Sequence, residues 1–305
     1  MTESLLREAL TLYTLTNPQM ELIRHNENMT YKITDNGGCY VLRIHKPVYG
    51  FAMDVFSAGY DRLALIKNEL EIIFDLKNRA GLSVQTPVRG NNGQFTQTLK
   101  DGTPVTMLEW VDGETVEKAK LTTKLLYDSG KLLAVMHKHF RKQADSGKRY
   151  VRYTYDQAIL SKIKERIENA ARAEAITGEQ ERTIMLALDE MKIRIDELDN
   201  LHEKQIVHAD LMKSNMIVNA DGRLTPIDFS LCGYSHIYMD IACIYGLAHD
   251  DEGRKHIIEG YKSVTKCDIN PRYLEPYIAL GVVLFIAWQY ERAKDNGVSD
   301  LQFTK

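Results

Sequence analysis

The stretch that decides the fold is His208-Ala209-Asp210-Leu211-Met212-Lys213-Ser214-Asn215, followed by Pro226-Ile227-Asp228-Phe229-Ser230. Asp210 and Asn215 lie five residues apart on a loop between apolar segments, and Asp228 comes thirteen residues after Asn215. The residues between them predict a hairpin, with strands at 216–218 and 224–227 and a turn at 219–222. Such a hairpin brings Asp228 back beside Asp210 and Asn215. Three oxygen-bearing side chains then converge, which suits a hard cation such as Mg²⁺.

This pattern favours phosphoryl transfer to a hydroxyl, which requires charge neutralisation and an aligned nucleophile more than covalent catalysis. Asp210 would orient the acceptor hydroxyl and take its proton, while Asn215 and Asp228 would hold the metal. The alternative interpretation is turn chemistry, because Asp and Asn are common in loops. The joint spacing argues against that alternative.

The motif H-x-D-x-x-x-x-N followed by I-D-F resembles the catalytic loop and metal-binding aspartate of the kinase superfamily. Three details resemble its aminoglycoside phosphotransferase and choline kinase branch. Ala209 stands where protein kinases carry arginine, no Ala-Pro-Glu segment follows Asp228, and Asp240 lies in the run YMDIA. The resemblance implies ATP as the phosphate donor, with GTP as an alternative because hinge contacts are made by backbone atoms, and Mg²⁺ as the cofactor.

The resemblance extends into the first third of the chain. The run NENMTY resembles the family's phosphate-side loop, and YVLR resembles the strand whose arginine replaces the phosphate-pairing lysine of other kinases. A helix glutamate would pair with that arginine, and the run MLEWVDG resembles the hinge that meets adenine through a carbonyl and an N–H. The residues so implied are Asn28 and Thr30, Arg43, Glu69, and Glu109 with Val111. Outside the family frame, Arg43 and Glu69 could be an ordinary surface ion pair.

Two positions depart from the family pattern. Ser230 follows Phe229 where many of these phosphotransferases carry a carboxylate, so a second acidic group near the metal is missing. Lys213 stands where many relatives have proline; it could touch the transferring phosphate or face solvent. His208 is expected to pack the catalytic loop, because Asp210 already fills the role of proton acceptor.

The periodicity of the chain predicts an α+β, bilobal protein-kinase-like fold. Residues 1–111 would form a nucleotide-binding lobe with a small antiparallel sheet and one main helix, and residues 112–305 a larger, mainly helical catalytic and substrate-binding lobe. The predicted helices lie at 5–15, 61–79, 122–140, 155–171 and 179–201, and the predicted strands at 31–34, 39–45, 87–89 and 105–110. Asp35-Asn36-Gly37-Gly38 is the hairpin turn, and Gly81 ends the second helix.

Composition excludes several classes of protein. With 305 residues, 44% of them hydrophobic, the chain can bury a large core, and 39 basic against 42 acidic residues argue against nucleic acid or an anionic membrane as the main partner. Four scattered cysteines and no apolar leader predict a reduced, cytoplasmic setting. The apolar run Tyr277–Gln289 is shorter than the ~20 residues of a membrane helix, which predicts a buried core helix. Nothing in the sequence indicates an oligomeric state.

The expected acceptor is a small molecule with a hydroxyl group, such as an amino alcohol, a sugar or an aminoglycoside-like compound. Its recognition would fall to helices after residue 240 and to inserts such as Val48–Tyr60. The acidic run His249–Glu252 could bind a cation or be a solvated loop. Aromatic side chains could form a cage for a quaternary amine or belong to the core; they are Tyr245, Phe285, Trp288 and Tyr290.

Two other functions stay open at this point. An atypical protein serine/threonine kinase would share the fold, although no recognisable activation segment is present. A nucleotide-binding scaffold without turnover is favoured only by Ser230.

Overall fold

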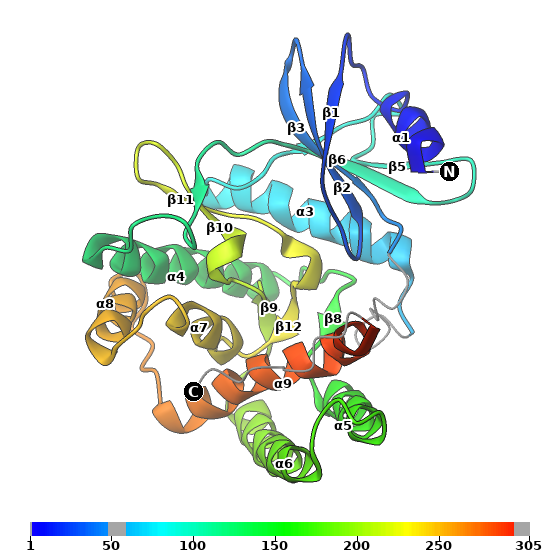
Figure 1. Cartoon of the computed structure of the whole chain (residues 1–305). Helices are drawn as coiled ribbons and strands as arrows, with labels where there is room; N and C mark the ends of the chain where they lie inside the picture. The colour runs from blue at the N-terminus through cyan, green and yellow to red at the C-terminus, as the bar shows by residue number, and fades with distance from the viewer. Residues whose placement is uncertain (1, 48–58, 296–305) are drawn as a thin grey trace. The chain divides into compact units, whose positions relative to one another are not determined.

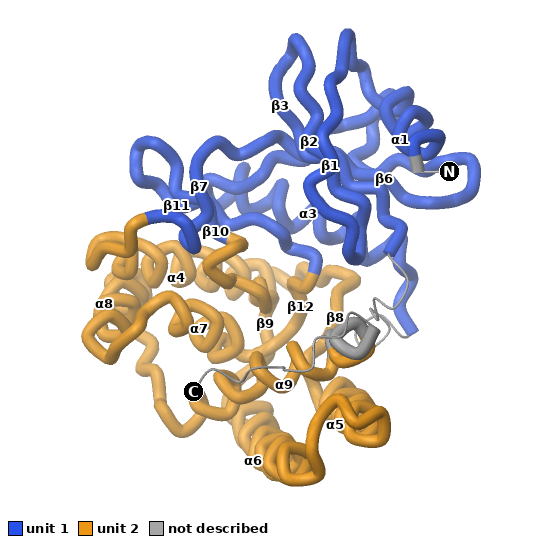
Figure 2. The backbone as a smooth tube through the Cα atoms, viewed as in Figure 1, with its two compact units in different colours: residues 1–51, 59–119, 216–230 blue, residues 52–58, 120–215, 231–305 orange. Residues whose placement is uncertain are grey.

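The computed structural model describes residues 2–47 and 59–295 and divides the chain into two compact units (Figure 2). Unit 1 comprises residues 1–51, 59–119 and 216–230, and unit 2 comprises 52–58, 120–215 and 231–305. The predicted lobe boundary after residue 111 stays a prediction. Residues 48–58 of the predicted insert Val48–Tyr60 lie outside the described residues.

Unit 1 is built on an antiparallel sheet in the order β1-β2-β3-β6-β4, with β5 also paired to β6 (Figure 1). Its strands are β1 Gln19–His25, β2 Met29–Asp35, β3 Gly38–Ile44, β4 Pro87–Val88, β5 Thr96–Thr98 and β6 Pro104–Glu109. The predicted hairpin is β2–β3, with Asp35 opposite Gly38. Gly38 has φ 139°, a conformation that favours glycine.

Strand β1 was not predicted. All seven of its residues are exposed, and Met20, Leu22 and Ile23 expose 46%, 54% and 46% of their surface. Half-buried strands are recognised by alternating apolar and polar residues. Because neither face of β1 is buried, its sequence QMELIRH is not constrained to alternate and was not recognised as a strand.

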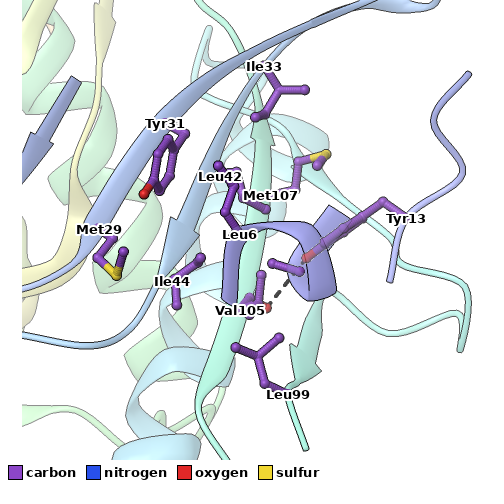
Figure 3. Close-up of a cluster of buried hydrophobic side chains, with 11 residues drawn as sticks. Leu6, Tyr13, Met29, Tyr31, Ile33, Leu42, Ile44, Leu99, Val105 and Met107 are labelled. Atoms are coloured by element: carbon purple, nitrogen blue, oxygen red, sulfur yellow. Dashed lines mark hydrogen bonds between the residues drawn. The ribbon is translucent and has the colours of Figure 1, made fainter. Parts of the chain in front are cut away.

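Two helices accompany the sheet. Helix α3, Arg62–Ala80, begins after Asp61, whose side chain accepts from the Leu63 N–H, and ends at Gly81 with φ 68°, as predicted. Helix α1, Thr2–Leu10, is shorter than the predicted 5–15. It contributes to a buried cluster together with side chains of β2, β3 and β6 (Figure 3); members of the cluster include Leu6, Met29, Ile33, Leu42 and Met107.

A second, three-stranded sheet belongs to unit 1. It consists of β7 Glu114–Thr115, β10 Met216–Val218 and β11 Leu224–Pro226, all antiparallel. The hairpin β10–β11 confirms the predicted strand-turn-strand, and the Asn219 N–H donates to the Arg223 carbonyl within its turn. The hydroxyl of Thr225 lies 2.7 Å from that of Ser83, so this late segment is bonded to residues far earlier in the chain.

Unit 2 is mainly helical, which confirms the α+β class. Its helices are α4 Thr123–Asp145, α5 Gln157–Arg172, α6 Gly178–Leu201, α7 Tyr238–Tyr245, α8 Asp251–Lys262 and α9 Pro271–Asp295. A small sheet in the order β8-β12-β9 lies among them, formed by Tyr153–Thr154, Gly233–Ser235 and Gln205–Val207. Thr177 and Gln180 form a reciprocal capping box at the start of α6.

Glycines allow α4 and α8 to cross closely. A Cβ added to Gly130 would lie 1.9 Å from the Ile257 carbonyl oxygen, and one added to Gly260 would lie 1.9 Å from that of Tyr127. Any side chain at either position would therefore push the helix backbones apart.

The prediction that Tyr277–Gln289 forms a buried core helix is wrong in one respect. This run lies within α9, where Tyr277, Leu280 and Val283 are buried, but Ile278, Val282 and Phe285 expose 41%, 49% and 57% of their surface. The helix has two faces, and its apolar residues occupy both. Among the described residues, no helix is long and apolar enough to cross a membrane.

Candidate active site

Unit 1 gathers four of its charged side chains into one group, here called the unit 1 cluster: Arg24, Arg43, Glu69 and Asp228. They come from β1, β3, α3 and the segment after β11. The cluster thus joins residues up to 204 positions apart in the chain.

Arg43 and Glu69 form the buried pair at the centre of this cluster. The Arg43 Nη2 donates to Glu69 Oε1 at 2.8 Å, and the two side chains expose only 8% and 4% of their surface. Strand β3 directs Arg43 inward between its register neighbours Thr30 and Thr106. The pair is therefore no ordinary surface ion pair, because burial removes the solvent screening that weakens such pairs.

Asp228 lies between the two arginines. Its Oδ2 is 2.6 Å from Arg24 Nη2, and its Oδ1 is 3.8 Å from Arg43 Nη1. Burial alone would raise the pKa of Asp228, but the charges of Arg24 and Arg43 and a hydrogen bond from Ser230 lower that pKa to about 2. Asp228 is thus ionised at neutral pH, and the Ser230 side chain supports this ionised state through its hydrogen bond.

Arg24 was missed by sequence reasoning. It lies on the unpredicted strand β1, 204 residues from its partner Asp228. The only signal near it in the sequence is its position two residues before the phosphate-side loop. In the structure, Glu27 of that loop lies 3.6 Å from the Arg24 guanidinium. Burial raises the pKa of Glu27, and the charge of Asp228 raises it further.

The predicted phosphate-side loop connects β1 to β2. His25 pairs with Met29 across it, and the Asn26 N–H donates to the Asn28 carbonyl at 3.2 Å. Asn28 and Thr30 are both buried, at 4% and 7% exposure. Thr30 thus lies on β2 directly opposite Arg43 of β3, and Asn28 lies in the turn between β1 and β2.

The predicted hinge follows β6. The Glu109 N–H donates to Thr86, and the Trp110 N–H donates to Cys39, each at 2.8 Å. Val111 comes immediately after this last bond to β3. The Glu109 side chain is 54% exposed and lies 3.6 Å from Lys77, so any contact of Glu109 with a buried group would come from its backbone.

Unit 2 holds the other predicted residues. Asn215 donates through Nδ2 to the Asp210 carbonyl at 2.9 Å and to Asp210 Oδ2 at 2.7 Å. Because both partners are acceptors, the amide must turn its NH₂ toward Asp210, which leaves its oxygen for a cation. His208 is fully buried and its Nδ1 accepts from the Asp210 N–H at 3.3 Å, in agreement with the expected packing role.

Asp240 anchors the loop that carries Asp210. Its carboxylate accepts from the backbone N–H groups of His208 and Ala209 at 2.8 and 2.7 Å, and His137 Nε2 lies 3.0 Å from it. Burial alone would raise the pKa of Asp240, but these partners lower it. Ala209 has φ 66°, a left-handed conformation that disfavours larger, branched side chains. His137 was not predicted, since it lies over a hundred residues away on α4.

Buried polar atoms test whether these residues suit a nucleotide and a cation. Within residues 2–47 and 59–295, Asp228 Oδ1, Arg43 Nε and Thr30 Oγ1 are buried without a hydrogen-bond partner. A carboxylate oxygen suits Mg²⁺, and a guanidinium N–H suits a phosphate oxygen. In the same described part of the chain, no three His, Cys, Asp or Glu side chains gather at one possible metal site. The donor set fits a hard cation and a phosphate.

Known proteins resemble this chain in sequence and in fold. The sequence matches the phosphotransferase enzyme family over residues 20–277. The chain belongs to this family. As a member of the family, it is an enzyme that transfers phosphate, as the sequence predicted. A comparison with curated protein sequences gave no match.

Solved structures share the fold of this phosphotransferase. A microcompartment-associated aminopropanol kinase aligns with TM-score 0.75 and 21% identity over 97% of this chain and 94% of its own. The amicoumacin kinase hAmiN, in complex with AMP-PNP, Ca²⁺ and amicoumacin, aligns with 0.72 and 18% over 97% and 90%. The choline kinase LicA from Streptococcus pneumoniae aligns with 0.63 and 15% over 96% and 92%. These matches confirm the predicted kinase-like fold.

Other predicted residues of the phosphotransferase have structural roles. In the acidic run, Asp250 caps α8 by accepting from the Gly253 N–H, and Asp251 is 97% exposed and pairs with Arg254. Phe285 and Tyr290 do not face one common aromatic cage, because Phe285 is exposed whereas Tyr290 is buried with Arg166 over its ring at 5.0 Å. The side chain of Trp288 lies outside the described residues.

Proposed function

We propose that this enzyme transfers the γ-phosphate of ATP to a hydroxyl of a small molecule, with Mg²⁺ as cofactor. The observation that carries the proposal is the unit 1 cluster, in which buried Arg43 and ionised Asp228 present unpartnered polar atoms suited to phosphate and metal. The nucleotide complexes among the solved relatives, with AMP-PNP, ADP and GDP, support a nucleotide donor.

The chain's own residues divide the work. Arg43, oriented by Glu69, would hold phosphate oxygens of the donor, and Asn28 and Thr30 would position the loop beside them. Glu109 and Val111 would meet adenine through backbone atoms. Asn215 and Asp228 would hold Mg²⁺, which when bound neutralises phosphate charge.

Asp210 would be the catalytic base. The acceptor oxygen forms a bond to the γ-phosphorus, the bond from that phosphorus to the bridging oxygen breaks, and ADP leaves. The proton of the acceptor hydroxyl passes to the Asp210 carboxylate. Asn215 holds that carboxylate through Oδ2, and Asp240 fixes the loop from which it projects.

The acceptor would be an amino alcohol, a sugar or an aminoglycoside-like compound. Three of the solved relatives are an aminopropanol kinase, an amicoumacin kinase and a spectinomycin phosphotransferase, and these compounds guide the choice of test acceptors without identifying the substrate of this chain.

The test is Mg²⁺-dependent ADP release from ATP across a panel of amino alcohols, sugars, aminoglycosides and generic protein substrates. Asp210→Asn should lower the rate of release by about 10²–10⁴-fold. Asp145→Asn, at an exposed aspartate that ends α4, should leave it unchanged. Turnover with protein substrates alone would favour the protein kinase. Tight ATP binding without turnover on any acceptor would favour the scaffold.

A further inference from the structure

A cavity of about 410 Å³ lies within unit 2, between α4, β9 and the segment that follows α8. Neither Asp210 nor Asn215 lines it. Its size is within the range of small-molecule sites in proteins, roughly 300–1,000 Å³. The proposed phosphotransferase reaction gives this cavity no role.

The walls of the cavity are positively charged. Lys138, Arg141, Lys142 and Lys266 all line it, and its lining includes no carboxylate. Among the described residues none of these four forms an ion pair, whereas other cations of unit 2's helices do; they include Lys164, Arg194, Arg254 and Lys262. Asp268, the acidic residue nearest in sequence, is paired with Lys262 at 2.8 Å. Four unpaired cations around one cavity create a field that attracts an anion.

The floor of the cavity is polar and buried. Tyr261 is 2% exposed, and its hydroxyl lies 2.9 Å from Nδ1 of His137, which is itself 4% exposed. Gln205, also 2% exposed, donates to the His137 carbonyl at 3.3 Å. Ile237 and Val264 add an apolar wall. The site thus combines a charged rim with a short apolar side, which suits a small organic anion.

We propose that this cavity binds a small phosphate monoester. The planar fork of Arg141 and the point charges of the lysines suit the oxygens of a dianion, and the wall formed by Ile237 and Val264 suits its carbon chain. This assignment does not depend on the identity of the phosphate acceptor or on turnover.

Cys267 provides a local reporter, because its thiol is half-buried and lines the cavity. Burial and the charge of Asp268 raise the pKa of this thiol, so maleimide alkylation is followed at alkaline pH by mass spectrometry. Glycerol phosphate should slow alkylation of Cys267 and leave that of Cys39, a half-buried thiol in unit 1, unchanged. Glycerol itself should protect neither.

Removal of the rim charges tests the site directly. In Lys138→Gln/Lys142→Gln, about tenfold more glycerol phosphate should be needed for the same protection, since each partly exposed cation contributes roughly threefold. The matched control is Lys131→Gln/Lys192→Gln, which removes two exposed lysines of unit 2 that lie outside the cavity. It should behave as wild type.

A second measurement does not rely on the thiol. Glycerol phosphate should raise the melting temperature of the wild type and of the control more than that of Lys138→Gln/Lys142→Gln. Equal stabilisation of all three proteins, or no protection of Cys267 in the wild type, would overturn the site. Equal protection by inorganic phosphate and glycerol phosphate would overturn the ester in favour of free phosphate.

Discussion

Replacing Glu69 by glutamine should destabilise unit 1 far more than the same replacement at an exposed position of α3, because Glu69 is buried. The substitution keeps the size of the side chain and one oxygen acceptor, but it leaves Arg43, 8% exposed, without its closest negative charge. Removing one partner of a buried pair costs ~3–5 kcal/mol. Arg43 keeps Asp228 at 3.8 Å, and the amide oxygen still accepts a bond. We therefore expect a loss of about 2–3 kcal/mol.

Urea denaturation read by amide exchange in strand β3 would measure this loss in unit 1 by itself. The matched control is Glu71→Gln, two residues further along α3 at an exposed position, which should change stability by less than about 0.5 kcal/mol. If Glu69→Gln cost no more than Glu71→Gln, the argument that burial makes the Arg43–Glu69 pair important would be refuted.

Four further predictions concern other parts of the molecule. Asp210→Asn should lower kcat by about 10²–10⁴ while nucleotide affinity, measured by calorimetry, stays the same, because a general base contributes that much. In metal-free protein the folded-state pKa of Asp228 is about 2, below its ordinary 3.8. The stability that ionised Asp228 gives the folded state is therefore complete above pH ~4 and is lost as the pH falls through 2. Between these limits the free energy of unfolding of the wild type should fall by about 2 kcal/mol more than that of Asp228→Asn, as measured by acid denaturation. Arg24→Ala frees one oxygen of that carboxylate, so Mn²⁺ binding followed by electron paramagnetic resonance should tighten by roughly three- to tenfold, and weaker binding would contradict competition between Arg24 and the metal. Gly130→Ala should destabilise unit 2 by about 1–3 kcal/mol through overpacking, whereas Gly281→Ala, in open space within α9, should stabilise it by about 0.5–1 kcal/mol; thermal melts of the two variants that move in the same direction would rule this out.

The parts of the fold that sequence could predict are those governed by local chemistry. The hairpin turn at Asp35–Gly38, the end of α3 at Gly81 and the strand-turn-strand after Asn215 follow from residues that dictate their own backbone conformation. The Asp210–Asn215 hydrogen bond is likewise local, because it joins residues five apart.

The parts that escaped prediction depend on distant partners. The contact of Arg24 with Asp228 and that of His137 with Asp240 each join residues over a hundred positions apart, so neither site residue could be recognised from its neighbours in the sequence. Strand β1 has no buried face to impose a pattern. Helix α9 has apolar residues on both sides, so its composition could not indicate which side packs against the rest of unit 2.

The interleaving of the two units has a consequence for synthesis on the ribosome. Residues 216–230 complete unit 1, but they are translated about a hundred residues after Ala119, where the earlier part of that unit ends. At typical translation speeds this delay lasts ~5–20 s. During that time Arg43 has emerged without Asp228, and a chain released after residue 119 would lack this carboxylate permanently. Splitting the coding sequence at that point would not yield a complete unit 1, because Asp228 of that unit is encoded after residue 119.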